Sequence, residues 1–214
     1  MLSLDLFRQL GLFIQPNFLD HRSCIDLLTK LQTADGQPAL VLPRQDRQIL
    51  TAQVDPYHRQ TEQLQVPSTT TDWITAQLRQ LQPTLARHFN LELTGIQNPL
   101  FYRYSQGSFF GAHCDGLRPT FGHRTLQSDA PSFLQERQIS VILFLNEQTP
   151  DPQPRCYCGG SLVFYGLIDP SQWQTHGFPF PGQPGLLVAF RSDLWHEVQA
   201  VTAGERYTLV SWYT

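Results

Sequence analysis

The stretch YSQGSFFGAHCD, residues 104–115, ends on a histidine and a carboxylate two positions apart, His113 and Asp115. In an extended strand, side chains at positions i and i+2 point to the same side, so both groups can aim at one point while Cys114 turns away. Two imidazoles and one carboxylate make the facial triad that holds Fe(II) and leaves coordination positions open. His-x-Asp alone is a weak signal in a chain with 7 histidines, so the second imidazole must be found elsewhere.

A second stretch, LWHEVQAVTAGERYTLVSW at 194–212, supplies His196 and then Arg206. Residues 202–204 are expected to form a tight turn between two antiparallel strands, which would place His196 and Arg206 on neighbouring strands. An arginine there can hold a carboxylate through two parallel hydrogen bonds. The alternative for Arg206 is a surface salt bridge with a glutamate such as Glu205.

Length and composition allow one large globular domain or two small ones, and the lack of an internal repeat or linker in the sequence favours one. The chain has 214 residues, 41% hydrophobic content and a net charge of −3, so a large core is expected and a basic surface for nucleic acid or an anionic membrane is not. No apolar run approaches the ~18 residues of a membrane span, and the N-terminus lacks the pattern of a signal peptide. We therefore expect no membrane partner and a cytoplasmic location.

The four cysteines, Cys24, Cys114, Cys156 and Cys158, have no regular spacing. Free thiols in a reducing cytoplasm are the expectation. Cys156 and Cys158 could suggest a second metal site, but no second cysteine pair stands at zinc spacing, which favours a structural role.

Two helices are predicted in the first half of the chain, after a lead-in over residues 1–16. Asp20 is a plausible N-cap for a helix whose apolar face repeats at helical spacing up to Leu31. A longer helix over 72–89, with caps offered by Thr70 to Asp72, contains Pro83, which should kink or split it. Short strands are expected between the two, over 37–67.

After Gly95 the pattern becomes short strands separated by glycine and proline turns. Helices followed by such strands predict helices packed on a β-sandwich or barrel, a mainly β (α+β) fold. The expected strands cover residues 100–104, 108–113, 139–145, 162–165, 186–190, 195–201 and 206–213.

Two insertions, 116–136 and 166–182, are long for loops inside a compact domain. Long loops are usually functional, so these are candidate lids or substrate walls beside the metal-site strands. They carry aromatic residues, and the first also carries Arg118 and Arg124, which suits a groove for a peptide or an acidic small molecule; ordinary loop packing is the alternative.

Four segments together resemble the 2-oxoglutarate/Fe(II)-dependent dioxygenases, within them the prolyl 4-hydroxylase-like group. The segments are YRYSQGSFFGAHCD (102–115), RQISVILFLNE (137–147), GGSLVFYG (159–166) and PGLLVAFRSDLWHEVQAVTAGERYTLVSWY (184–213). The resemblance implies a double-stranded β-helix (jelly-roll) core over 99–214, supported by helices and strands over 1–98, in a single domain over 1–214.

The resemblance also implies roles for individual residues. His113, Asp115 and His196 would bind Fe(II), and Arg206 would pair with the distal carboxylate of 2-oxoglutarate. Tyr104 matches a tyrosine that hydrogen-bonds this cosubstrate, although a core aromatic is the alternative. The implied cofactors are Fe(II), 2-oxoglutarate and O₂, with ascorbate as an additional reductant.

The implied reaction is hydroxylation of an unactivated C–H bond with release of succinate and CO₂. A prolyl residue of a peptide or protein is the expected substrate, and a free amino acid or small metabolite is the alternative. A metal-holding or sensing β-barrel without turnover is a further alternative, against which Arg206 and Tyr104 argue. A nucleic-acid dealkylase of the same superfamily is disfavoured, because the second arginine typical of those enzymes is replaced by Trp212 and the net charge is negative.

Overall fold

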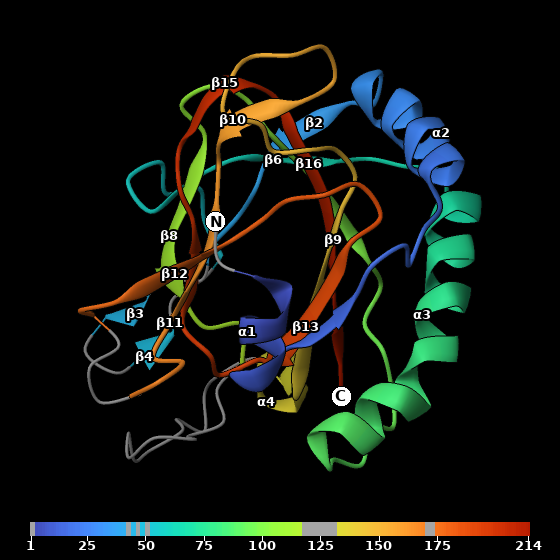
Figure 1. Cartoon of the computed structure of the whole chain (residues 1–214), viewed down its shortest axis with the longest axis vertical. Helices are drawn as coiled ribbons and strands as arrows, with labels where there is room; N and C mark the ends of the chain where they lie inside the picture. The colour runs from blue at the N-terminus through green and yellow to red at the C-terminus, as the bar shows by residue number, and fades with distance from the viewer. Residues whose placement is uncertain (1–2, 42–43, 46–47, 50–51, 117–131, 170–173) are drawn as a thin grey trace.

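Two antiparallel sheets form the centre of the molecule (Figure 1). The computed structural model describes residues 3–41, 44–45, 48–49, 52–116, 132–169 and 174–214. Within these residues, the larger sheet has 7 strands in the order β1 (Phe13–Gln15), β13 (Leu187–Arg191), β9 (Ile139–Phe144), β16 (Arg206–Tyr213), β7 (Leu100–Tyr104), β6 (Glu62–Leu64) and β2 (Gly36–Pro38).

The smaller sheet has 5 strands within the same described ranges, and it supplies the other layer. Their order is β12 (Gly177–Phe180), β11 (Leu162–Tyr165), β14 (His196–Val198), β8 (Phe109–His113) and β5 (Arg59–Gln60). Two short pairs complete the β structure, β10 (Tyr157–Gly159) with β15 (Val201–Gly204) and β3 (Arg44–Gln45) with β4 (Gln48–Ile49). This arrangement confirms the predicted mainly β fold with supporting helices.

Two helices cover the outer face of the larger sheet (Figure 1). The first is α2 (His21–Gln32), which begins as predicted at Asp20, whose carboxylate accepts a hydrogen bond from the Ser23 amide at 2.7 Å. The second is α3 (Ser68–Phe89). The remaining helices of the described chain are short, α1 (Leu4–Gln9) and α4 (Ser132–Glu136).

The sequence predicted that Pro83 would kink or split the longer helix, and the prediction of a split is wrong. α3 runs through Pro83 without interruption, and it begins after Pro67 without a side-chain cap, so Thr70 to Asp72 lie inside the helix. Of the expected caps, Asp72 lies beyond the first turn of the helix. A proline removes one hydrogen bond, but tertiary packing of an apolar face supplies most of a helix's stability in a protein. The buried face of α3 comprises Thr70, Ile74, Leu78, Leu81 and Leu85.

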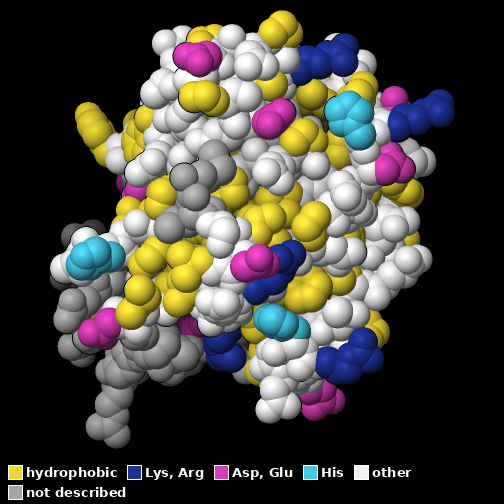
Figure 2. Space-filling view, viewed as in Figure 1, with side chains coloured by type: hydrophobic (Ala, Val, Ile, Leu, Met, Phe, Trp, Pro, Cys, Tyr) yellow, Lys and Arg dark blue, Asp and Glu magenta, His cyan; other side chains and the backbone are white. Residues whose placement is uncertain are grey.

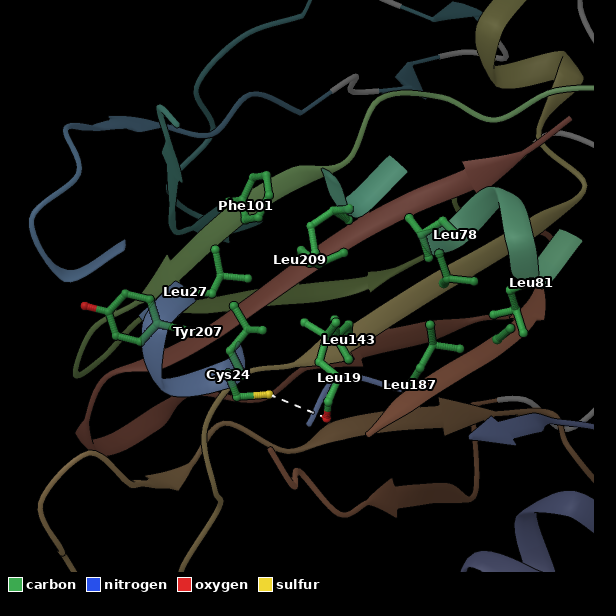
Figure 3. Close-up of a cluster of buried hydrophobic side chains, with 14 of the residues drawn as sticks. Leu19, Cys24, Leu27, Leu78, Leu81, Phe101, Leu143, Leu187, Tyr207 and Leu209 are labelled. Atoms are coloured by element: carbon green, nitrogen blue, oxygen red, sulfur yellow. Dashed lines mark hydrogen bonds between the residues drawn. The ribbon is translucent and has the colours of Figure 1, made fainter. Parts of the chain in front are cut away.

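The apolar run of β9 is continuous because both of its faces are buried. Val141 and Leu143 point toward α2 and α3, while Ile142 and Phe144 point into the space between the two sheets. Figure 3 shows the first of these cores, with Leu143 among leucines of both helices and of neighbouring strands. The second core holds the sheets together and includes Phe7 of α1.

Four local predictions differ from the structure, and long-range strand pairing explains the first two. The lead-in over 1–16 contains α1 and β1, and β1 is recruited by pairing with β13. The predicted turn at 202–204 is part of strand β15, which pairs with β10. The predicted strand at 195–201 is divided between β14 and β15. The expected strands over 37–67 are shorter than predicted, and several of their residues lie outside the described part of the chain.

Figure 2 shows charged side chains of both signs scattered over one face of the molecule, without a broad basic area on that face. Among the helices of the described residues, none combines the length and the hydropathy that a bilayer span requires. All four cysteines are free thiols, as expected.

Leu143→Ala should destabilise the chain by about 3 kcal/mol, because it opens a cavity in the core between the larger sheet and its helices. Urea denaturation gives the free energy of unfolding. Ile168→Ala is the matched control, since Ile168 is 72% exposed and should change stability by less than about 0.5 kcal/mol. A similar small effect for both substitutions would contradict the description of this core.

Candidate metal centre

His113, Asp115 and His196 form one cluster at the edge where β8 ends and β14 begins. Their candidate ligand atoms all lie within 4.8 Å of one another. Asp115 lies between the two rings, with Oδ1 3.6 Å from His113 Nε2 and Oδ2 3.6 Å from His196 Nε2. The cluster follows from strand pairing, because His196 and His113 are directly opposite each other in the β14–β8 ladder.

Each imidazole is oriented by a backbone carbonyl two residues earlier. His113 Nδ1 lies 2.9 Å from Gly111 O, and His196 Nδ1 lies 3.0 Å from Leu194 O. A carbonyl can only accept, so each Nδ1 carries the hydrogen and each Nε2 keeps its lone pair. Such bonds fix the tautomer and the ring direction of metal-binding histidines. Both Nε2 atoms face Asp115, so the three residues fit a divalent metal ion.

Asp115 reaches this position through a turn. β8 ends at His113, and Ser192 O then accepts hydrogen bonds from the amides of Asp115 (2.9 Å) and Gly116 (2.8 Å). Cys114 Sγ lies 3.1 Å from Asp193 O, so it points away from the cluster as the i, i+2 argument predicts. A Cβ at position 116 would lie 2.9 Å from both Arg137 O and Ser192 Cβ, which leaves room only for glycine.

The electrostatic environment gives the cluster the protonation states that a metal needs. Burial raises the pKa of Asp115, but attraction to His196 and His113, together with the charge of Arg137, outweighs it and holds the pKa well below its usual range. Burial and repulsion from His113 lower the pKa of His196 to about 4, although Asp115 opposes the shift. At neutral pH the carboxylate is ionised and His196 is neutral.

Arg206 is fully buried on the inner face of the larger sheet. It pairs with Tyr104 across the β16–β7 ladder, and its guanidinium carbon lies 5.0 Å from the Tyr104 ring centre and 5.2 Å from that of Phe144. Nη1 donates to Thr208 Oγ1 at 3.3 Å, whereas Nε and Nη2 are buried with no partner among the described residues. The surface salt bridge considered for Arg206 is therefore not formed.

An unpaired buried guanidinium is costly, so its surroundings point to a missing anion. Tyr157, which sequence analysis did not identify, adds a second buried group without a partner, its hydroxyl. Burial raises the pKa of Tyr157 and the Arg206 charge opposes that shift, so the two groups are close. A Cβ at Gly182 would collide with the Tyr157 hydroxyl, which keeps this corner open. A carboxylate of 2-oxoglutarate fits these donors.

The prediction that His196 and Arg206 lie on neighbouring strands is wrong. His196 is on β14 of the smaller sheet and Arg206 is on β16 of the larger one. The reason is β15, which lies between them in the chain and pairs with β10 instead of turning directly back. His196 and Tyr104, the strand partner of Arg206, line one cavity between the sheets.

That cavity has a volume of about 640 Å³, within the range of small-molecule sites. It contains the whole metal cluster and Tyr104. From the first predicted insertion, Phe133 and Leu134 form part of its wall, whereas Arg118, His123 and Arg124 lie outside the described residues. The described part of the second insertion does not line the cavity, which corrects its assignment as a substrate wall; Trp173 lies outside the described residues.

Four further cavity residues were not identified from the sequence: His58, Arg59, Tyr102 and Arg137. Arg137 stacks on Trp212, with its guanidinium carbon 3.5 Å from the ring centre, and donates to Gln97 and to the backbone oxygen of Asp115. Trp212 thus occupies the position at which a second arginine was sought. Alternation along β7 and β16 could have indicated Tyr102 and Trp212, but no local signal indicates His58 or Arg59.

Two antiparallel sheets enclosing a cavity with a two-histidine, one-carboxylate cluster define the class of double-stranded β-helix proteins with a mononuclear metal centre. The model of the 2OG-Fe(II) oxygenase superfamily matches residues 99–214, more than half of the sequence. The chain belongs to this superfamily, whose cofactors are Fe(II), 2-oxoglutarate and O₂.

The chain is also similar in sequence to two curated hydroxylases. It is 28% identical over 155 residues to a PKHD-type hydroxylase of Picosynechococcus sp., covering 72% of this chain and 59% of that protein. It is 32% identical over 136 residues to one of Burkholderia lata, covering 62% and 51%. The chain thus spans about half the length of these curated relatives.

The fold is shared with solved prolyl hydroxylases. A Pseudomonas putida prolyl-4-hydroxylase superposes with a TM-score of 0.66 at 22% identity, covering 98% of this chain and 95% of that one. A Trichoplax adhaerens prolyl hydroxylase, solved in complex with a hypoxia inducible factor peptide fragment, superposes with a TM-score of 0.65 at 18% identity, covering 98% and 86%. At these identities the likeness concerns the fold.

The metal-free chain should lose stability as the pH falls from 7.5 to 5. His196 has a pKa of about 4 in the fold against an ordinary value of 6.5, so in this window the unfolded chain binds a proton that the folded chain does not. The expected loss is about 2 kcal/mol at pH 5 in urea denaturation. His196→Asn should show a clearly smaller loss, and equal losses would rule out this origin.

Proposed function

We propose that this chain is an Fe(II)- and 2-oxoglutarate-dependent oxygenase that hydroxylates an unactivated C–H bond. The observation that carries the proposal is the coexistence of two features in one fold. One is the cluster of His113, Asp115 and His196, and the other is Arg206, a buried cation with two unpartnered nitrogens beside the cavity. A site that only held or sensed a metal would not need the second feature.

In this proposal His113, Asp115 and His196 bind Fe(II) through both Nε2 atoms and the carboxylate. Arg206 holds the distal carboxylate of 2-oxoglutarate, with Tyr104 beside it on the neighbouring strand. The Tyr157 hydroxyl is a further donor to the same carboxylate, because it is buried and unpartnered near Arg206. Charge-assisted hydrogen bonds of this kind are roughly twice as strong as neutral ones.

When bound, Fe(II) and 2-oxoglutarate supply an oxidation by O₂ that inserts one oxygen atom into a C–H bond and releases succinate and CO₂. The chain's own contribution is placement and exclusion of water. Both histidine rings are fixed by their Nδ1 bonds, His196 stays neutral, and Asp115 stays ionised. Phe110, which stacks on His113 with ring centres 3.6 Å apart, shields the outer side of that ligand. Ascorbate would serve as an additional reductant.

For the substrate, we propose a prolyl residue of a peptide or protein. Support comes from the superposed prolyl hydroxylases, one of which holds a peptide, and from half-exposed apolar side chains on the cavity wall, Leu40 and Phe133. A free amino acid or small metabolite is the second candidate, which the cavity volume of about 640 Å³ would accommodate. Mass spectrometry of a peptide and metabolite panel, for a gain of one oxygen that needs Fe(II) and 2-oxoglutarate, decides between them.

We also propose that residues 1–214 act as one domain, without nucleic-acid or membrane partners and in the cytoplasm. The first 98 residues supply β1, β2 and β6 to the larger sheet and β5 to the smaller one, so the support region and the core are built together.

His113→Ala should reduce Fe(II) affinity and 2-oxoglutarate-dependent succinate formation by more than about 100-fold, since even outer partners of metal ligands contribute 10–100-fold. Calorimetry without oxygen measures the metal affinity, and a chelator should abolish succinate formation by the wild-type chain. His21→Ala is the control, because His21 is exposed at the start of α2. Wild-type succinate formation in His113→Ala would contradict the proposed metal site.

Arg206→Gln and Tyr157→Phe should weaken 2-oxoglutarate binding without removing the metal. Loss of the Tyr157 hydroxyl removes one hydrogen bond to a charged group and should raise the KM for 2-oxoglutarate about tenfold, while loss of the guanidinium charge should raise it more. Phe144→Leu, an apolar change beside the same guanidinium, controls for packing. An unchanged KM for 2-oxoglutarate in both variants would place the cosubstrate elsewhere.

A further inference from the structure

Arg59 is a buried cation that lines the cavity, whereas Arg206 lies beside it. Arg59 lies on β5, the edge strand next to β8, and is only 8% exposed. Its guanidinium lies between two aromatic rings that line the cavity, 4.4 Å from the Tyr102 ring centre and 4.3 Å from that of Phe110. Because Phe110 also stacks on His113, a single ring separates Arg59 from a metal ligand.

The polar contacts of Arg59 leave its charge unneutralised. Nη1 lies 3.3 Å from Leu40 O, and Nε is buried without a partner. In the described part of the chain, Arg59 forms no ion pair with a carboxylate. Two carboxylates lie near Arg59 in sequence. Glu62 pairs with Arg103 Nε at 2.8 Å, and Asp55, which also lines the cavity, accepts from the Tyr57 amide at 3.0 Å. Stacking on rings orients a guanidinium but does not replace a counter-ion.

Arg137, the other arginine of the described cavity wall, differs in this respect. Its Nε donates to Gln97 Oε1 at 2.9 Å and its Nη1 to Asp115 O at 3.2 Å, and its charge acts on the Asp115 carboxylate. Arg137 thus supports the metal ligand, whereas the polar groups that Arg59 acts on in the described chain, Leu40 O and the Tyr102 hydroxyl, are neutral and do not balance its charge.

Charge balance then indicates what the rest of the cavity requires. In the proposed function, the dication Fe(II) and the cation Arg206 are offset by Asp115 and by the dianion 2-oxoglutarate. Arg59 and Arg137 are left on the substrate side, with Asp55 as the carboxylate of the described wall. Among the described residues, the substrate side therefore keeps a net positive charge after both cofactors are bound, and positive charge in a cavity concentrates anions.

We propose that the molecule hydroxylated by this chain carries a carboxylate that pairs with Arg59. This inference rests on the proposed function and names the substrate class of the same site. A carboxylate matches the planar fork of a guanidinium better than a neutral carbonyl does, and a partner that is already buried and oriented makes the pair strong. The carboxylate can belong to an acidic residue beside the target residue of a peptide, or to a free amino acid or other small acid.

The test compares matched acids and amides by calorimetry on the full chain with Fe(II) and 2-oxoglutarate, without oxygen so that nothing turns over. One series pairs N-acetyl amino acids, N-acetylproline among them, with their amides. The other pairs acetyl-Pro-Asp-amide with acetyl-Pro-Asn-amide. We expect the acid of at least one series to bind about tenfold or more tightly than its amide, and that series identifies the source of the carboxylate.

Variants then show which residue causes the tighter binding of the acid. Arg59→Gln should abolish the preference for the acid, Arg59→Lys should retain part of it, and Arg87→Gln, which removes the same charge from an exposed site on α3, should leave it unchanged. A preference that survives Arg59→Gln overturns the proposal. So does the absence of any preference in the wild-type chain, whether both members of every pair bind or neither does, and this comparison needs no variant to fold.

Titration of 2-oxoglutarate into the Fe(II)-loaded chain separates the two levels of inference. If 2-oxoglutarate fails to bind, the proposed function is contradicted, whatever the role of Arg59. If 2-oxoglutarate binds but acids do not bind more tightly than their amides, only the inference that the substrate carries a carboxylate is contradicted. A purely structural role for Arg59 predicts a lower melting temperature of Arg59→Gln together with an unchanged ratio of acid to amide affinities.

Discussion

The metal site depends on one strand pairing, the antiparallel ladder of β14 and β8 that sets His196 opposite His113. A shift of one residue in this ladder would turn one imidazole to the other face of the sheet, because side chains alternate along a strand. The register is reinforced by the turn before β14, where Ser192 O accepts the amides of Asp115 and Gly116. The same backbone segment thus places all three candidate ligands.

A second ladder, in the other sheet, sets the cosubstrate side. Arg206 lies opposite Tyr104, and Asn146 holds both neighbours of Arg206 by accepting from the Tyr207 amide at 2.9 Å and donating to Glu205 O at 2.7 Å. The distance between the two ladders is then fixed by the close-packed core between the sheets. The site is therefore preorganised by the registers of these two ladders and by the core packed between the two sheets.

The buried guanidinium of Arg206 has a thermodynamic consequence for the fold. An unneutralised charge in the interior costs several kcal/mol, so the chain without cosubstrate is strained electrostatically at this point. An anion that binds only the folded state returns this energy as stability. Binding of an anionic ligand thus explains the buried Arg206 charge on β16 better than packing does. The unpartnered hydroxyl of Tyr157 near Arg206 has the same explanation.

Sequence reasoning succeeded where the signal is local. The strands β7, β9 and β11 match their predicted ranges because they alternate or are apolar throughout, and Asp20 caps α2 because capping involves only the next turn. It failed where pairing is long-range. Strand β15 resembles a turn until β10 pairs with it, and β1 is a strand only because β13 offers an edge.

The candidate site divides in the same way. His113, Asp115, His196, Arg206 and Tyr104 were identified from spacing and resemblance, and the structure brings the first three together and pairs the last two. Tyr157 and Arg59 could not be found from the sequence, because each comes from a strand whose position is decided by partners far along the chain. Their relevance follows only from burial without hydrogen-bond partners, a property that no sequence pattern encodes.

The two halves of the cavity are built from different parts of the fold, and this bears on how specificity arises. The cofactor half lies on β7, β8, β14 and β16, the inner strands of both sheets. Arg59 lies on β5, an edge strand that pairs with β8 through Arg59 and Gln60. A change at an edge strand leaves the inner registers intact, so substrate preference can alter there while the metal chemistry is kept. The registers that place the metal cluster are therefore more tightly constrained by the fold than the position of Arg59 is.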